Sequence, residues 1–313
     1  MSQSTSVSKQ TSTHTYLQDE RNESILININ GELFAREEAK ISVFDSAFML
    51  GDGVWEGLRV HNGKVAFLQT HLDRLYAGAK ALDFHPGLSQ IELIQRIQDT
   101  LDANHMHEGV HLRLMVSRGT KSTPYQDPRV TITPPTIVII PEYKEALPDT
   151  VENGIHLFTV HVRRGFPDVQ DPKLNSHSKI NCILACIQAT KAGADEALML
   201  DPHGFVATCN STHFFIIKDN KVITSSGQYC IDGVTRGAVL SICEEQNIAS
   251  SQTNFSLFDV YSADEAFVTG TFAGLVPVCS VDGREIGDGK RGPMVEKLQQ
   301  FYMQLLEQEC ADG

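Results

Sequence analysis

The residue with the clearest potential for chemistry is a lysine at the start of an expected helix. Residues 171–185 read Asp-Pro-Lys-Leu-Asn-Ser-His-Ser-Lys-Ile-Asn-Cys-Ile-Leu-Ala, and the second lysine of this stretch is Lys179. An amine held on a rigid element can bond to a carbonyl carbon, so Lys179 is a candidate amine for holding an aldehyde cofactor. A solvated lysine in a first helical turn is the commoner alternative, and this stretch alone does not decide between them.

The residues around Lys179 predict how it is positioned. Apolar side chains recur after it at helical spacing and predict a helix that buries one stripe. The stripe consists of Ile180, Ile183, Leu184 and Ile187. Ser178 is a plausible N-cap of this helix, and Gly193 is a plausible C-terminal stop.

Other segments carry groups that could hold an anion. Arg59 lies in an otherwise apolar strand, where a guanidinium needs an anion or a carboxylate as partner. Residues 233–236, Gly-Val-Thr-Arg, open a helix whose free N–H groups and dipole favour a phosphate, although many helices begin this way. His111 and Arg113 share one face of an alternating strand, which could line a carboxylate site or simply face solvent.

Composition restricts the class of protein. The chain has 313 residues, of which 41% are hydrophobic and 21% charged, as in ordinary globular proteins. Its formal net charge of −13 argues against nucleic acid as a partner, because such binding depends on basic side chains. The seven cysteines lack metal-ligand spacing, so we expect no metal and a reduced, cytoplasmic protein. No apolar run approaches about 18 residues, so we expect no membrane span.

Turn signals and periodicity predict a mixed α/β fold in two domains. In the first half, the patterns predict strands at residues 25–35, 110–119 and 136–140 and helices at residues 70–82 and 91–101. The polar segment 141–148 is the best linker, so we expect a small α/β domain at 25–147 and a large one at 148–313. Residues 1–24 are rich in Ser, Thr and Gln, lack the apolar core of a signal peptide and predict a disordered tail.

Five short motifs occur in an order that resembles one enzyme family. They are residues 51–59, 71–75, 193–197, 233–236 and 269–271. Over about residues 25–305 the series resembles the fold-type IV, pyridoxal-phosphate-dependent class IV aminotransferases, which include branched-chain and D-amino-acid aminotransferases. The resemblance implies two α/β domains with pyridoxal 5′-phosphate between them, and a homodimer. It also implies transfer of an amino group between a small amino acid or amine and a 2-oxo acid.

The resemblance assigns roles to individual residues. Arg59 is similar to the arginine that pairs with the cofactor phosphate, and Ile231 to the residue that packs against the pyridine ring. The N–H groups of Val234 and Thr235 and the side chain of Thr271 would complete the phosphate site. The residues implied to receive the substrate are His111, Arg113, Phe272 and Ala273.

The chain departs from the family pattern at the cofactor lysine. In an alignment without gaps, Asn175 stands where the family has this lysine, and Lys179 stands at a family tyrosine that reaches the cofactor. Since Lys179 lies one helical turn along, we predict that it bonds the cofactor aldehyde and then acts as general acid and base. Lys173 is the rival, because a gapped alignment could bring it into register.

A second departure is Thr208, which stands where the family has a glutamate paired with the pyridine nitrogen. A hydroxyl can donate to that nitrogen and leave it unprotonated, which makes the ring a weaker electron sink. A weaker sink slows transamination but is compatible with elimination. An aminotransferase is therefore the leading hypothesis, with a lyase or eliminase on the same fold and a catalytically silent cofactor-binding homologue as alternatives.

Overall fold

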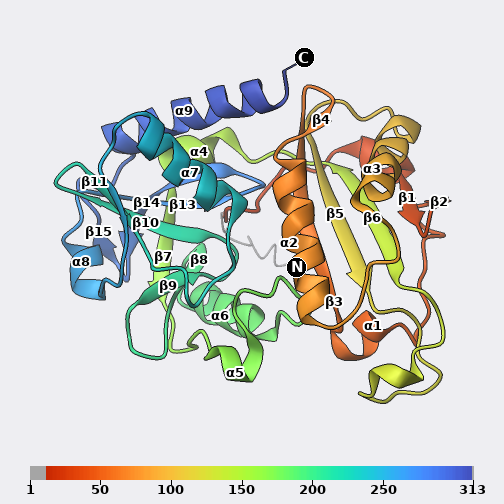
Figure 1. The fold of residues 1–313 in the computed structure, drawn as a ribbon. Coiled ribbons are helices and arrows are strands. Elements are labelled where there is room, and N and C mark those ends of the chain that lie inside the picture. Colours follow the sequence, from red (N-terminus) through yellow and green to blue (C-terminus); the bar gives the residue numbers. More distant parts are fainter. Residues whose placement is uncertain (1–11, 312–313) are drawn as a thin grey trace, which may run out of the picture.

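A computed structural model describes residues 12–311 as two domains, each built on one β-sheet (Figure 1). Strands of the first sheet end at Tyr143 and strands of the second begin at Ile155, an interval that contains the expected boundary near residue 148. Helices and strands are mixed in both domains, so the α/β class predicted from the sequence is confirmed.

Six antiparallel strands form the sheet of the small domain, in the order β2-β1-β6-β5-β3-β4. Their bounds are β1 Leu26–Ile29, β2 Glu32–Ala35, β3 Gly53–His61, β4 Lys64–Val65, β5 Val110–Ser117 and β6 Thr136–Tyr143. The expected Asn-Gly hairpin joins β1 to β2, with Asn30 and Gly31 both at positive φ.

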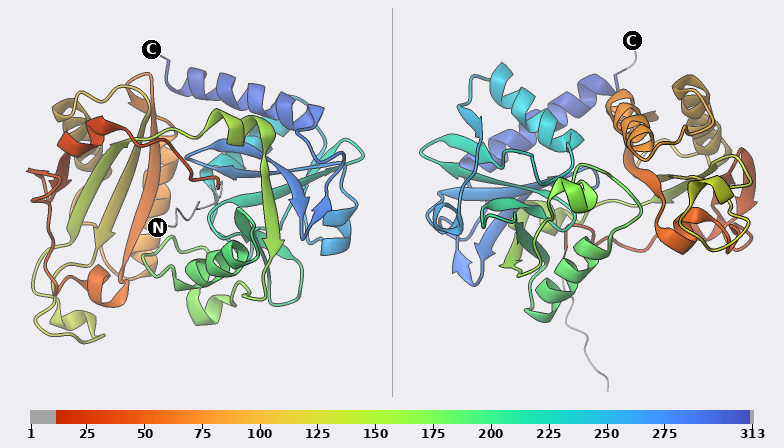
Figure 2. Two further views of the ribbon diagram at one scale, coloured as in Figure 1. Left: turned by 180° about the vertical axis from the view of Figure 1, so that it is seen from behind. Right: turned by 60° about the horizontal axis from the view of Figure 1, so that its bottom comes forward.

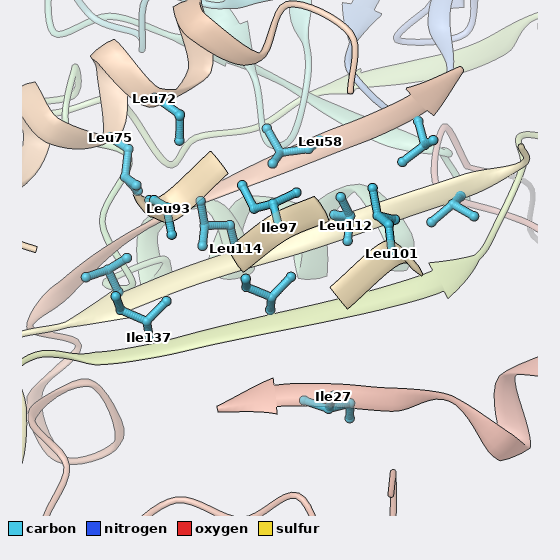
Figure 3. Close-up of a cluster of buried hydrophobic side chains, with 14 of the residues drawn as sticks. Ile27, Leu58, Leu72, Leu75, Leu93, Ile97, Leu101, Leu112, Leu114 and Ile137 are labelled. Carbon is cyan, nitrogen blue, oxygen red and sulfur yellow. The ribbon is translucent and has the colours of Figure 1, made fainter. Parts of the chain in front are cut away.

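Two long helices cover one face of this sheet, α2 (Leu68–Ala81) and α3 (Gln90–Ala103). Both occur where the apolar spacing predicts helices. Figure 3 shows their leucines and isoleucines meeting the side chains of β3 and β5 in one closely packed core. Leu72, Leu93, Leu58 and Leu112 in this core are each completely buried. A short helix α1 (Ser46–Leu50) precedes β3, and a 3-10 turn (Pro128–Val130) precedes β6.

Nine strands form the sheet of the large domain, in the order β12-β11-β10-β13-β14-β7-β8-β9 with β15 paired to β14. Their bounds are β7 Ile155–Thr159, β8 Glu196–Leu200, β9 Val206–Cys209, β10 His213–Lys218, β11 Lys221–Thr224, β12 Ser250–Gln252, β13 Glu265–Gly270, β14 Gly274–Val281 and β15 Arg284–Glu285. Its helices are α4 Pro148–Asn153, α5 Pro167–Gln170, α6 Ile180–Lys191, α7 Val234–Glu245, α8 Leu257–Tyr261 and α9 Pro293–Glu309.

Helices lie on both sides of this sheet (Figure 2). On one side, α7 and α9 bury Val239, Ile242 and Leu298 in a cluster with Phe215 and Phe267 of the central strands. On the other side, α6 packs close to β8. None of the helices within residues 12–311 is long and apolar enough to cross a bilayer.

The orientation of α6 differs from the expectation. The predicted stripe Ile180, Ile183, Leu184 and Ile187 is between 45% and 63% exposed instead of buried. The buried face carries Ala185 and Ala189, whose small side chains let the helix approach β8 closely. Lys179 is the N-cap and Ser178 lies one residue earlier, so the helix begins without a side-chain cap. The large apolar face of α6 therefore points away from this chain's own core.

Residues 12–24, the described part of the segment expected to be a disordered tail, pack against both domains. Residues 20–24 form a 3-10 turn, Glu20–Ser24. The Asn22 side chain donates to the carbonyl of Tyr143 at 2.9 Å and accepts from its N–H at 2.8 Å. These two hydrogen bonds hold the segment beside the end of β6. Composition alone does not predict this contact. The same prediction also covers residues 1–11, which lie outside the residues that the structure describes.

Candidate active site

A cavity of about 380 Å³ lies between the two domains. The small domain contributes Trp55 from β3 and Arg113 from β5, and the large domain contributes residues of α6, β9 and the loop before α7. A second cavity of about 150 Å³ adjoins it, since Trp55, Asn175 and Ile231 line both.

Backbone pairing with β3 holds the segment that leads into α6. The N–H of Trp55 donates to the carbonyl of Asn175 at 3.1 Å, and the N–H of His177 donates to the carbonyl of Gly53 at 3.0 Å. The Asn175 side chain is buried and donates from Nδ2 to the carbonyl of Trp55 at 2.6 Å. This pairing fixes the direction of the chain as it approaches Lys179.

Lys179 lines the larger cavity. Its Nζ donates to Oδ1 of Asn175 at 3.0 Å and lies 5.2 Å from the centre of the Trp55 ring. Burial lowers the pKa of the amine from 10.5 to about 8, and the charges of neighbouring arginines contribute to this. The neutral and hence nucleophilic fraction of this amine near neutral pH is therefore much larger than that of an ordinary lysine.

Lys173 does not line either cavity. Its side chain is 53% exposed, and its Nζ lies 3.9 Å from Oδ2 of Asp232, which is also exposed. A turn closed by Asp171, whose Oδ1 accepts from the N–H of Lys173 at 2.9 Å, directs this lysine outward. The structure therefore places the lysines as the ungapped alignment does, with Lys179 inside and Lys173 outside.

The start of α7 forms a cradle suited to an anion. Its N-cap, Gly233, provides no side-chain cap, so the first N–H groups of the helix are left for another acceptor. Val234, Thr235 and Thr271 line the smaller cavity together with Gly233. A Cβ at Gly233 would lie 2.3 Å from Cε1 of His213, so only glycine fits here.

Arg74 of α2 supplies the basic group of this cradle. It lines the smaller cavity, and its Nη1 donates to the carbonyl of Asp232, just before α7, at 2.6 Å. Two further bonds hold the guanidinium to the buried carboxylate of Glu56, at 2.8 and 2.6 Å. His71 contacts the same carboxylate at 2.7 Å. Of the five N–H groups of Arg74, two are left over for a ligand.

Arg59 of β3 lines a neighbouring small cavity with His111 and Phe272, which also line the cavity at the start of α7. Its charge acts on Tyr302, which forms a side-chain hydrogen bond with Thr235 of α7. Sequence reasoning assigned the phosphate to Arg59 and did not single out Arg74. A signal for Arg74 was present, because a histidine and an arginine three residues apart share the apolar face of α2 and require a buried acid.

Thr208 and Ile231 both reach the larger cavity. Thr208 is buried, and its hydroxyl donates to the carbonyl of Thr212 at 2.8 Å. With its proton used in this way, Thr208 can accept a hydrogen bond from a cavity ligand but does not donate one, which differs from the expectation. The carbonyl of Ile231 accepts from Nε2 of His213 at 2.9 Å, and burial lowers the pKa of this histidine to about 4.

Three of the four residues expected to receive substrate meet at the smaller cavity. The guanidinium of Arg113 lies 3.8 Å from the centre of the Trp55 ring, and the His111 ring meets Phe272 edge-on at 5.6 Å. Burial lowers the pKa of His111 to about 3, so this ring is neutral beside Arg113. Ala273 does not line the cavity and packs instead against the core of the large domain.

Comparison with known proteins identifies the family. The sequence pattern of the class IV amino-transferase family matches residues 53–281, which include β3, the segment before α6 and the cradle of α7. The chain belongs to this family. "Branched-chain-amino-acid aminotransferase-like protein 2" of Arabidopsis thaliana is 39% identical over 286 residues, which are 91% of this chain and 51% of that protein. The chain thus spans about half the length of this relative.

Other members of the class IV aminotransferase family match over most of their length. The putative branched-chain-amino-acid aminotransferase of Methanocaldococcus jannaschii is 37% identical over 280 residues, covering 89% of this chain and 96% of that protein. A branched-chain amino acid aminotransferase solved with pyridoxamine 5′-phosphate superposes with a TM-score of 0.85 at 28% identity. That match covers 90% of this chain and 94% of the other.

The residues present fit pyridoxal 5′-phosphate, the aldehyde counterpart of the pyridoxamine 5′-phosphate in that structure. Pyridoxal 5′-phosphate needs an amine for its aldehyde, an apolar contact for its ring and donors for a dianion. The adjoining cavities offer Lys179, Ile231 and the α7 cradle with Arg74. In addition, the hydroxyl of Thr269 lines the smaller cavity, is buried and has no partner within residues 12–311.

Substitution of the two arginines tests the cradle. We expect Arg74→Lys to weaken binding of the cofactor by about tenfold or more, because lysine cannot keep the planar bonds to Glu56 and still reach the anion. Arg59→Lys is the parallel variant, and a loss of affinity confined to it would assign the phosphate to Arg59 instead. Fluorescence titration gives both constants, and thermal unfolding checks that each variant folds. An equal loss of affinity in both variants would contradict the assignment.

Proposed function

We propose that this chain is a pyridoxal-phosphate-dependent aminotransferase that moves an amino group between a small amino acid or amine and a 2-oxo acid. The observation that carries the proposal is the placement of two groups in adjoining cavities. One is the Lys179 amine with its lowered pKa, and the other is the uncapped start of α7 beside Arg74. Relatives named branched-chain-amino-acid and D-alanine aminotransferases support a small amino acid as the donor.

Lys179 is the residue that we propose to bond the cofactor aldehyde. When bound, pyridoxal phosphate supplies a conjugated ring that withdraws electrons from the carbon carrying the amino group. Lys179 would take the proton from that carbon and deliver it to the carbon of the former aldehyde group, because its pKa of about 8 suits both directions of transfer. The bond from Nζ to Asn175 keeps the amine at the cavity between these steps.

The phosphate would bind at the start of α7 beside Arg74, with Arg59 as the arginine that the sequence predicts to pair with it. Glu56 fixes the plane of the Arg74 guanidinium through two hydrogen bonds, so its remaining N–H groups have a fixed direction. Val234 and Thr235 would contribute backbone N–H groups and Thr271 a hydroxyl. This arrangement would anchor the phosphate end of the cofactor, with Ile231 available to contact the ring.

On the substrate side, we propose that Arg113 and His111 orient the donor. Arg113 is held over Trp55, which in turn donates from Nε1 to the carbonyl of Ser176 at 3.1 Å. A guanidinium held in this way can receive a substrate carboxylate without reorganising. Phe272 covers the apolar side of the same space.

A lyase or eliminase on the same fold is the second candidate, and Thr208 favours it. The threonine hydroxyl already donates to Thr212, so it offers the cofactor ring an uncharged acceptor in place of a carboxylate. An uncharged acceptor stabilises a protonated ring nitrogen less than a carboxylate does. The weaker electron sink reduces the advantage of transamination over elimination.

We also propose a homodimer in a reducing compartment such as the cytoplasm. The α6 face, defined as Ile180, Ile183, Leu184, Ile187 and Val169 of α5, is apolar and exposed, and Ile183 also lines the larger cavity. A second copy covering this face would remove apolar surface from water and close one side of the site. All seven cysteines are free thiols, which supports a reducing compartment.

The lysine assignment predicts where the cofactor attaches. Borohydride reduction of the holoenzyme, followed by peptide mass spectrometry, should find the cofactor on Lys179. Lys179→Ala should abolish this attachment, whereas Lys173→Ala should not. Because the amine is neutral above its pKa, attachment should become faster as the pH rises to about 8 and change little beyond it. Attachment to Lys173, or a rate independent of pH between 6 and 8, would reject the assignment.

The choice between transfer and elimination predicts the products. With a panel of small amino donors and a 2-oxo acid, we expect a new amino acid to accumulate in step with loss of the donor, with little free ammonia. Thr208→Glu should raise the transamination rate if weak protonation of the ring nitrogen limits that rate. Ammonia and 2-oxo acid released without an acceptor would instead establish the lyase. Cofactor retained without turnover of any donor would identify a silent homologue.

The α6 face predicts the effect of a charge on assembly. Leu184→Asp, at a position 47% exposed, should convert the dimer to a monomer because a buried carboxylate at the interface is costly. Ile91→Asp on α3, at a position 79% exposed, is the matched control and should leave the dimer intact. Light scattering after size-exclusion chromatography measures both. A wild-type monomer, or a Leu184→Asp dimer, would rule out this interface.

A further inference from the structure

The first described residues pass across the mouth of the cavity. Residues 12–17, here named the N-terminal strap, run from the small domain to the large domain between the two sheets (Figure 2, left). We infer that the strap closes the substrate side of the cavity and that His14 determines which substrates enter. The role of His14 in substrate choice rests on the proposed function, whereas closure of the cavity by the strap does not.

One end of the strap is held by a buried carboxylate in the large domain. The Thr13 hydroxyl donates to Oε2 of Glu196 at 3.0 Å, and both side chains are at most 2% exposed. The other oxygen, Oε1, accepts from the N–H and hydroxyl of Ser211 and from the hydroxyl of Thr212. Within residues 12–311, Thr13 is the only partner of Oε2.

The arrangement around Glu196 implies that the strap belongs to the folded state. A buried carboxylate oxygen without a donor is strongly unfavourable, so the position of Glu196 requires Thr13 or a replacement such as water. A turn closed by the bond from the N–H of Thr15 to the carbonyl of Ser12, at 3.0 Å, shapes the strap around this contact. Thr13 therefore supplies the donor to Oε2 of a carboxylate whose other oxygen is already bonded within the large domain.

The other end of the strap is held by the small domain. The Lys144 ammonium lies 4.3 Å from the centre of the Tyr16 ring, a cation–π contact. Farther along, the paired hydrogen bonds of Asn22 with Tyr143 fix the chain beside β6. Because its two ends are held by different domains, the strap spans the gap between them.

His14 lies between these two anchors and faces the cavity. Its ring stacks on Phe272 with centres 5.7 Å apart and an angle of 15° between the planes. His14 lines both adjoining cavities, as do Trp55 and Arg113. If Arg113 binds the carboxylate of an amino donor, a side chain of that donor that extends toward the mouth of the cavity would meet the imidazole of His14. The ring thus limits the size of the side chain that the site accepts.

Removal of the imidazole tests its role in specificity. Relative to alanine as donor, we expect His14→Ala to raise kcat/KM for leucine and phenylalanine by about tenfold, because the wall that excludes larger side chains is gone. His14→Phe keeps an aromatic plate of similar shape and should retain the wild-type ranking. Leu17→Ala, at a position of the strap that is 76% exposed, is the control and should change nothing. An unchanged ranking in His14→Ala overturns the specificity role.

A second measurement tests closure without turnover. Trp55 is the only tryptophan of the chain and lines the same cavities, so quenching of its fluorescence by acrylamide reports access from solvent. In full-length protein at equal cofactor content, His14→Ala and Thr13→Val should both increase the quenching constant, and Leu17→Ala should not. A constant unchanged in both variants shows that the strap does not close the cavity. Increased quenching in a protein without transaminase activity would reject the proposed function while supporting closure.

Discussion

The pairing of residues 175–177 with β3 is the interaction on which the rest of the site depends. It joins a segment of the large domain to β3, near one edge of the small-domain sheet, through two backbone hydrogen bonds. The side chain of Asn175 adds a third bond to the same strand. Because each N–H and carbonyl in this buried region needs a partner, the register of this segment is set by the strand. Lys179 reaches the cavity as a consequence of that register, and Lys173, on the far side of the Asp171 turn, does not.

A second constraint is the compensation of buried charge around Glu56. This carboxylate is completely buried and holds both Arg74 and His71. Its removal would leave a buried guanidinium unpaired, which typically costs about 3–5 kcal/mol. The same carboxylate aligns Arg74 with the carbonyl of Asp232 at the start of α7, so Glu56 links the small domain to the large one.

Local patterns in the sequence specify much of this structure. The Asn-Gly turn, the helices α2 and α3 and the strands of the small domain all lie where spacing and turn residues predict them. The inward position of Lys179 was expected from the ungapped family alignment, because its local stretch alone left a solvated lysine as an alternative. The role of Arg74 does not follow from local patterns. The crossing of α2 over β3 brings its guanidinium to the carbonyl of Asp232 before α7, and that is a tertiary property.

The α6 stripe and the N-terminal strap were not predictable for related reasons. Spacing shows that Ile180 and Leu184 share a helix face, but it does not show whether this chain or another covers that face. In α6 the alanine face packs inward, since small side chains allow a closer approach to β8. The strap is polar and resembles a disordered segment in composition. Its order comes from single long-range contacts, such as that between Thr13 and Glu196, which no local pattern contains.

The two departures from the family pattern have a common electrostatic consequence. Within residues 12–311, the larger cavity is lined by Arg113, Arg164 and Lys179 and by no carboxylate. Basic groups in a shared low-dielectric space repel each other's protons, which is part of the reason why the pKa of Lys179 is lowered. A glutamate at position 208 would counter this effect and keep the lysine protonated. With threonine there, the amine is neutral more of the time, which favours its attack on an aldehyde.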